Sequence, residues 1–286
     1  MRHYFISLFL ILLTSSLSVG KTSRVSVPLQ EVLDKKLVLL KIKSLGGHSG
    51  ECVQFIVKNT SADTLNFYLE AGRRLIPDSV IYQSIFIAKE RKIQMKPGAN
   101  LSFSAFGFCS NAPKSSPKKG RTFLPGSVPD SNWAKLGIFL SAHELKNGQI
   151  QDAVWVLSNN HQIASVLDDG SANVTALRKL LAEIKKMDLP NYSISFIKSD
   201  SLLFSGLGKE ITSTLDYSLK NACAISILVK NERGVVVKSL SSNMPQKQGK
   251  FQYPVKIDIR NWKKGKYKLV IQDEMAMEKA KLDFEI

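Results

Sequence analysis

Short segments of alternating apolar and polar residues follow one another from Leu37 to about Cys109, and they constrain the fold more than any other feature of the sequence. Alternation at period two predicts half-buried strands, and the Gly, Pro, Asn and Asp residues between them predict turns. No helical pattern separates these segments, although a parallel sheet would need crossover helices there. The sequence therefore predicts a β-sandwich. We expect strands over 37–42, 52–57, 65–69, 80–87 and 101–106.

The pattern changes after Cys109. Residues 112–131 are rich in Pro, Ser, Gly and Lys, which is typical of a long exposed loop. Three helices are expected beyond it, one starting near Ser131, one over 150–157 and one over 177–184. The third helix is the clearest, because four apolar residues recur at helical spacing on one face: Leu177, Leu180, Leu181 and Ile184.

Strand patterns return after Pro190, where proline ends the third helix. The predicted fold is therefore mainly β, an N-terminal β-sandwich with about three appended helices followed by a C-terminal Ig-like β-sandwich. We expect a signal peptide over 1–20, the N-terminal domain over 35–189, a linker or first strand over 190–210, and the C-terminal module over 211–286.

The first twenty residues have the organisation of a secretory signal peptide. Arg2 and His3 precede an apolar run over 4–13, and small residues lead to a cleavage site between Gly20 and Lys21. The apolar run is much shorter than the ~20 residues of a membrane-spanning helix. The sequence therefore predicts a protein that is secreted or displayed at the cell surface (periplasm or outer-membrane exterior), with no transmembrane segment after signal removal.

The chain is strongly basic, with 40 Lys and Arg against 24 Asp and Glu and a formal net charge of +16. A nucleic-acid-binding surface usually concentrates such charge on one face, whereas here it is spread over both predicted domains. An exported protein also rarely meets nucleic acid. We therefore expect no nucleic acid partner, and instead an unknown surface polymer or protein, with loose affinity for anionic envelope polymers.

Three cysteines are present, Cys52, Cys109 and Cys223. An oxidising compartment favours pairing, and the odd number leaves at least one thiol. The simplest assignment is a Cys52–Cys109 disulfide. The histidines that remain after signal removal lack metal-ligand spacing, so neither a metal nor a cofactor is expected. No credible acid/base pair is visible, which favours a non-enzymatic protein.

The C-terminal segments 214–219, 222–227 and 262–269 carry a first resemblance. They resemble Ig-like domains of the flagellar hook-cap type and the C-terminal sorting domains of type IX-secreted proteins. The resemblance covers about 211–286 and implies either an Ig-like spacer or a sorting signal read by the secretion machinery. The sorting domains often end in a basic, apolar tail, whereas this chain ends in Leu-Asp-Phe-Glu-Ile.

A second resemblance lies in the N-terminal domain. The stretch 59–83 resembles sandwich domains of bacterial surface proteins, and Gln-Asp-Ala-Val-Trp over 151–155 is similar to the Gln-x-Ala-Ile/Val-Trp motif of thioester domains in surface adhesins. That resemblance implies an internal thioester between Cys109 and Gln151, open to attack by host amines. Two departures are Ser110, where the family has an aromatic residue, and the short spacing of 41 intervening residues. The alternative is that Gln151 caps a helix that packs on the sheet.

These observations predict a secreted or surface-displayed bacterial protein with a non-enzymatic role in binding, adhesion or envelope structure. The first alternative is a covalent adhesin that uses the Cys109–Gln151 thioester. A hydrolase of envelope polymers is a more distant alternative.

Overall fold

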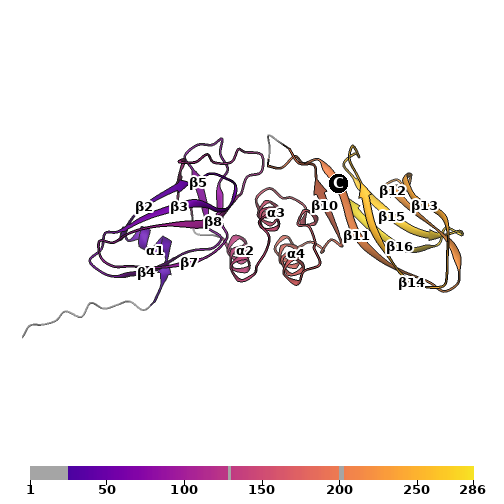
Figure 1. Cartoon of the computed structure of the whole chain (residues 1–286), viewed down its shortest axis with the longest axis horizontal. Coiled ribbons are helices and arrows are strands. Elements are labelled where there is room, and N and C mark those ends of the chain that lie inside the picture. The colour runs from indigo at the N-terminus through magenta and orange to yellow at the C-terminus, as the bar shows by residue number, and fades with distance from the viewer. Residues whose placement is uncertain (1–24, 128–129, 200–202) are drawn as a thin grey trace, which may run out of the picture.

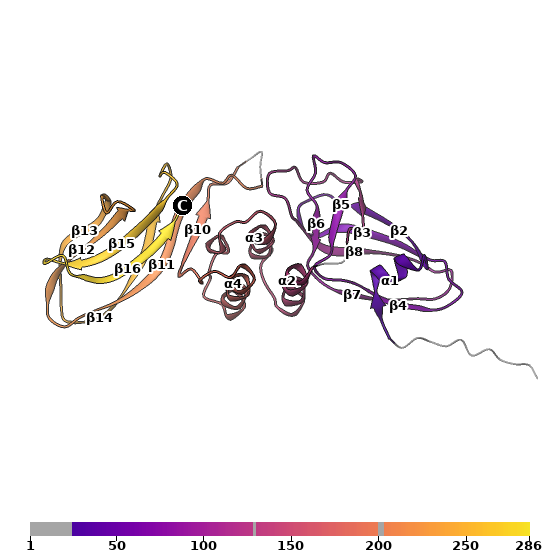
Figure 2. The same ribbon diagram turned by 180° about the vertical axis from the view of Figure 1, so that it is seen from behind.

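The computed structural model describes residues 25–127, 130–199 and 203–286. An N-terminal β body, a layer of three helices and a C-terminal β-sandwich follow one another along the long axis (Figure 1). The view from behind shows the same succession, with the helices between the two β parts (Figure 2). The predicted mainly β fold with a few helices is confirmed. The predicted Gly20–Lys21 cleavage site lies outside the described residues.

Two sheets share the core of the N-terminal body. The smaller sheet has the order β1-β4-β7, and the larger one closes as a barrel in the order β2-β3-β8-β6-β5-β9. The smaller sheet comprises β1 (Val27–Pro28), β4 (Leu65–Leu69) and β7 (Arg91–Met95). The barrel comprises β2 (Val38–Ser44), β3 (Ser49–Asn59), β5 (Arg74–Pro77), β6 (Ile85–Ile87), β8 (Asn100–Cys109) and β9 (Thr122–Leu124). A short helix, α1 (Leu29–Asp34), buries Leu29 and Val32 in the same core.

The alternation predicted from the sequence explains this packing. In β3, Val53, Phe55 and Val57 point inward while Gln54 and Ile56 between them are only partly buried. The Phe55 ring stacks on Phe103 of β8, with ring centroids 5.3 Å apart. Two aromatic rings at that distance bury a large apolar area, so the pair fixes the β3–β8 register near the middle of the core.

The helical layer packs on the outer face of the barrel. It consists of α2 (Ser131–Ala142), α3 (Asn147–Ser158) and α4 (Ala172–Lys185), with a 3-10 turn at Ile163–Ser165. Phe86 of β6 and Phe108 of β8 point outward from the barrel and pack in the apolar cluster of the helices. The helix predicted to start near Ser131 is capped by Asp130, whose carboxylate accepts hydrogen bonds from the backbone N–H groups of Asn132 and Trp133.

The C-terminal module is a sandwich of two sheets around one core. The sheets have the orders β10-β11-β14 and β13-β12-β15-β16, an arrangement of the Ig-like kind. The strands are β10 (Tyr192–Phe196), β11 (Gly208–Leu219), β12 (Cys223–Asn231), β13 (Val236–Gln246), β14 (Gly249–Asp258), β15 (Lys266–Asp273) and β16 (Glu278–Glu285). The segment 190–210 thus contains β10, which pairs with β11. No helix among the described residues has the length and apolarity needed to cross a membrane.

Candidate functional site

Cys109 is the last residue of β8, where the barrel meets the helical layer. Its backbone N–H donates to the carbonyl oxygen of His48, at 3.0 Å, and holds the strand end in place. The side chain is fully buried and belongs to the core of the barrel. Burial, and then the neighbouring Cys52, raise the pKa of the Cys109 thiol to about 12. The thiol is therefore protonated at neutral pH.

Gln151 reaches Cys109 from α3. Its side-chain Nε2 donates to the backbone carbonyl oxygen of Cys109, at 2.7 Å. Gln151 is 5% exposed, and its Oε1 is buried with no hydrogen-bond partner among the described residues. The two residues that the thioester resemblance singles out therefore lie in contact through the amide of one and the backbone of the other, in a place shielded from water.

The surroundings hold both residues firmly. The loop after Cys109 is fixed on one side by Gln83, whose buried side chain bonds Asn111 N and Lys114 O, and on the other by Asn159, whose Oδ1 accepts from Ala112 N. At the start of α3, the Gln149 side chain accepts from the backbone N–H of Lys146. This hydrogen bond satisfies the backbone N–H at the start of α3 and so stabilises the first turn of the helix that carries Gln151.

Cys52 and Cys109, the candidate disulfide, lie in the same apolar core, and each is a free thiol in the structure. Burial raises the pKa of Cys52 to about 11, and its Sγ lies 3.4 Å from the Gly107 carbonyl oxygen. Cys223 is free as well and only partly buried, at the start of β12. The Cys52–Cys109 pairing stays a prediction that the mass of the exported protein decides.

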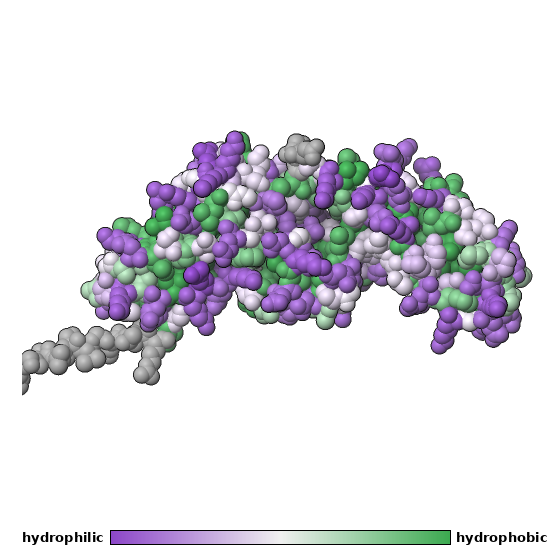
Figure 3. Space-filling model, viewed as in Figure 1, coloured by the Kyte–Doolittle hydropathy of each residue, from purple (hydrophilic) through white to green (hydrophobic). Residues whose placement is uncertain are grey.

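The adjoining face of α3 forms a second site, which the sequence did not reveal. Asp152 and Trp155 are three positions apart and therefore share one face of the helix. That face looks into a cavity of about 760 Å³ between the helical layer and the C-terminal module. Figure 3 shows the surface indented between the helices and the C-terminal strands. The other cavity walls come from the β10 strand, the segment after it, and the residues around Lys209 and Arg260.

Polar groups without partners mark this cavity. Burial raises the pKa of the Asp152 carboxyl to about 7, and the described residues supply it with no hydrogen bond. The indole Nε1 of Trp155 is also buried without a partner in the described part of the chain. Buried polar groups normally pair, so groups left unpaired in a cavity wall are ready for a ligand.

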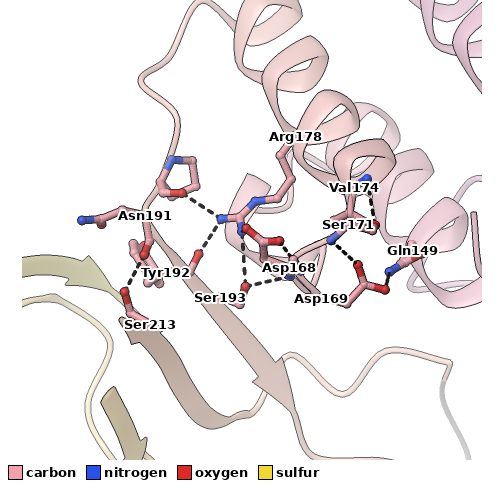
Figure 4. A network of polar contacts seen from close by, with 12 residues as sticks. Gln149, Asp168, Asp169, Ser171, Val174, Arg178, Asn191, Tyr192, Ser193 and Ser213 are labelled. Carbon is pink, nitrogen blue, oxygen red and sulfur yellow. Dashed lines mark hydrogen bonds and ion pairs between the residues drawn. The ribbon is translucent and has the colours of Figure 1, made fainter. Parts of the chain in front are cut away.

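A network around Arg178 lies next to this cavity (Figure 4). Arg178 of α4 is 3% exposed, and its Nη2 donates to the carbonyl oxygens of Pro190 and Tyr192, at 2.8 and 2.6 Å. Its Nη1 donates to Asp168, at 3.1 Å, and to the Ser193 hydroxyl, at 3.4 Å. Leu167, which precedes Asp168, and Ile194, which follows Ser193, both line the cavity. The arginine thus clamps the helical layer to the first strand of the C-terminal module.

His161 lies beside the cavity, with its ring centroid 4.0 Å from that of Phe204 and 5.8 Å from that of Trp155. Burial, and then the nearby Lys185, lower the pKa of His161 to about 4, so the ring is neutral at pH 7. Within the described ranges, no group of three His, Cys, Asp or Glu side chains has the arrangement of a metal site.

Comparison with known proteins gives little. No protein-family model matches the chain, and no curated protein matches it. Among solved structures, the chain is similar to one described as the CBM51-2 and INT domains of ZmpB from Clostridium perfringens, at 9% identity, with 87% of this chain and 80% of that chain covered. The TM-score is 0.19, so this likeness carries no argument about fold or function.

Proposed function

We propose that this chain is a secreted or surface-displayed, non-enzymatic binding protein with a role in adhesion or envelope structure. The observation that carries the proposal is the cavity between the helical layer and the C-terminal module. Its walls combine aromatic rings with the unpartnered indole N–H of Trp155 and the carboxyl of Asp152, as ligand sites do. Asp152 is the one carboxyl among its described lining residues, whereas acid/base hydrolysis of a glycosidic bond generally uses two.

Binding of the mature protein to envelope material tests this function. Fluorescently labelled protein is sedimented with insoluble cell-envelope polymer from the host bacterium, and the bound fraction is measured. Phe204→Ala removes a ring that lines the cavity. Phe251→Ala is the matched control, because that ring packs on Tyr217 in the C-terminal sandwich, away from the cavity. We expect Phe204→Ala alone to lower the bound fraction severalfold. Equal binding by both variants, or no binding by the unaltered protein, contradicts the proposal.

A second candidate function is covalent adhesion through a Cys109–Gln151 thioester. The amide of Gln151 lies 2.7 Å from the backbone carbonyl oxygen of Cys109, so the two residues are neighbours, while the thiol itself packs in the barrel core and must turn toward α3 to react. In this reaction the Cys109 Sγ attacks Cδ of Gln151, the Cδ–Nε2 bond breaks, and ammonia leaves with the thiol proton. An amine from a host surface then attacks Cδ, so that an amide forms and the thiol is released. The high pKa of Cys109 slows the first step, since the thiolate is the nucleophile.

Intact mass of the exported protein separates these states. A thioester lowers the mass by about 17 Da, the mass of the ammonia that leaves, and methylamine then adds to the protein. A Cys52–Cys109 disulfide lowers it by about 2 Da, because two thiol protons are lost. Gln151→Glu and Cys109→Ala are the controls, since neither can lose ammonia from this pair. An unshifted mass in the unaltered protein rules out the thioester and leaves non-covalent binding in place.

A further inference from the structure

The residues that line the cavity at the Asp152 face of α3 indicate which class of ligand it can bind. Trp155, Phe196 and Phe204 supply its aromatic surface. The rings are tilted against one another, by 56° between Trp155 and Phe204 and by 64° between Phe196 and Phe204. Walls at such angles form an apolar trough and offer no parallel slot for a flat base. A puckered ring with apolar C–H faces suits this trough better.

The inner polar groups call for hydroxyl partners. Asp152 and Trp155 are one turn apart on α3. The indole Nε1 of Trp155 is buried without a hydrogen-bond partner in the described chain, and the carboxyl of Asp152, which is partly buried, lines the cavity beside it. A carboxyl accepts hydrogen bonds and an indole N–H donates one, so a group that both donates and accepts can serve both. The hydroxyl groups of a saccharide have this property.

The outer rim is positively charged. Lys198, Lys209 and Arg260 line the cavity on the side of the C-terminal module, and all three are exposed. Arg260 pairs with Asp258, whereas no ion pair is found for Lys198 or Lys209 in the described residues. Charge of one sign around a concave site raises the local concentration of ligands of the opposite sign. The rim therefore selects an anionic ligand.

We propose that this cavity binds an acidic saccharide, with a sugar ring against Trp155 and Phe204, its hydroxyls on Asp152, and its carboxylate toward Lys198, Lys209 and Arg260. The inference rests on the proposed binding function and names its ligand class.

Calorimetric titration of the mature protein tests the ligand class. The probes are tetramers of galacturonate and of guluronate, a hyaluronan hexamer, a methyl-esterified galacturonate tetramer without charge, and a ten-residue oligothymidylate. We expect at least one of the carboxylated oligomers to bind, and the esterified tetramer to bind at least tenfold more weakly than its charged form. Absence of binding by all three carboxylated probes overturns the proposal, and so does tighter binding of the oligothymidylate.

Variants place the binding at this cavity. Lys198→Glu with Lys209→Glu reverses two rim charges, and we expect it to weaken binding at least tenfold. Lys58→Glu with Lys92→Glu makes the same change in charge at two exposed positions of the N-terminal body, and we expect less than a twofold effect. Equal weakening by both pairs means attraction by net charge and overturns the site. If envelope material still binds in a Phe204-dependent way while these oligomers do not, the ligand class fails and the binding function stands.

Discussion

The side-chain amide of Gln151 donates to the backbone carbonyl oxygen of Cys109 at 2.7 Å, across 42 positions of sequence. This contact joins α3 to the end of β8 and is buried on both sides. As long as Gln151 keeps its side-chain amide, the carbonyl of Cys109 depends on this donor. The contact therefore has a structural role that can be measured apart from any covalent chemistry.

Gln151→Met tests that role, because methionine keeps the volume and removes the donor. We expect a loss of about 1–3 kcal/mol in the free energy of unfolding, since the Cys109 carbonyl stays buried without its partner. Urea denaturation followed by circular dichroism gives the value. Gln252→Met at an exposed position of β14 is the control and should change stability by less than about 0.5 kcal/mol. A Gln151→Met protein as stable as the control variant would contradict the role.

Arg178→Met removes the clamp between α4 and the start of β10. We expect a loss of at least about 2 kcal/mol, because the carbonyls of Pro190 and Tyr192 lose a charged donor. Asp168 is 41% exposed and becomes solvated, which limits the loss from the broken ion pair. Lys179→Met, at the next and exposed position of α4, is the matched control. Similar urea midpoints for the two variants would show that the clamp is dispensable.

Asp152 makes stability depend on pH. Its pKa is raised by burial from 3.8 to about 7, so the folded protein holds a proton that the unfolded chain releases. Stability must then fall as the pH rises from about 4 to 7. Asp152→Asn lacks this titration. The stability of the variant relative to the unaltered protein should therefore increase as the pH rises through the same range. Urea denaturation of both proteins at pH 4.5 and pH 8 measures the gain. A difference between them that does not change with pH would refute the assignment.

Gly137 and Gly148 provide a pair with opposite expectations. A Cβ at Gly137 in α2 would lie 2.4 Å from the backbone nitrogen of Gly72 and 2.5 Å from the carbonyl carbon of Ala71. Gly137→Ala should therefore destabilise by about 1–3 kcal/mol, as overpacking does. At Gly148 in α3 nothing lies within 4 Å of the added Cβ, so Gly148→Ala should stabilise by up to about 1 kcal/mol. Thermal unfolding shows both signs, and two changes of the same sign would disprove the close packing of α2.

The long periodic elements were predictable from sequence, and the short or interrupted ones were not. The apolar stripe of α4 located that helix, although Leu180 and Ile184 turn out only partly buried and Arg178 is buried instead. The strand expected over 80–87 is confined to Ile85–Ile87, because Val80 and Ile81 are 82% and 59% exposed in a turn region. The strands β5 and β9 have four and three residues, too few for a period to show.

The two candidate sites also differ in whether the sequence indicated them. The resemblance singled out Cys109 and Gln151, and the structure brings them into contact. The cavity could not be predicted because its walls come from α3, β10 and Arg260 just beyond β14, which are distant in sequence. One signal was present: Asp152 is a carboxyl inside an otherwise apolar helix segment, next to Ala153, Val154 and Trp155.

The hydrogen bonds of Arg178 affect how the connection between the helical layer and the C-terminal sandwich responds to tension. The chain leaves α4 at Lys185 and enters β10 at Tyr192, a connection short enough to act as a hinge. Arg178 grips this connection at two carbonyls, and Ser213 of β11 holds the carbonyl of Asn191 between them. Tension applied to the C-terminal sandwich is then shared between the covalent chain and the side chain of α4. We therefore expect this joint to resist bending and extension more than the covalent connection alone would.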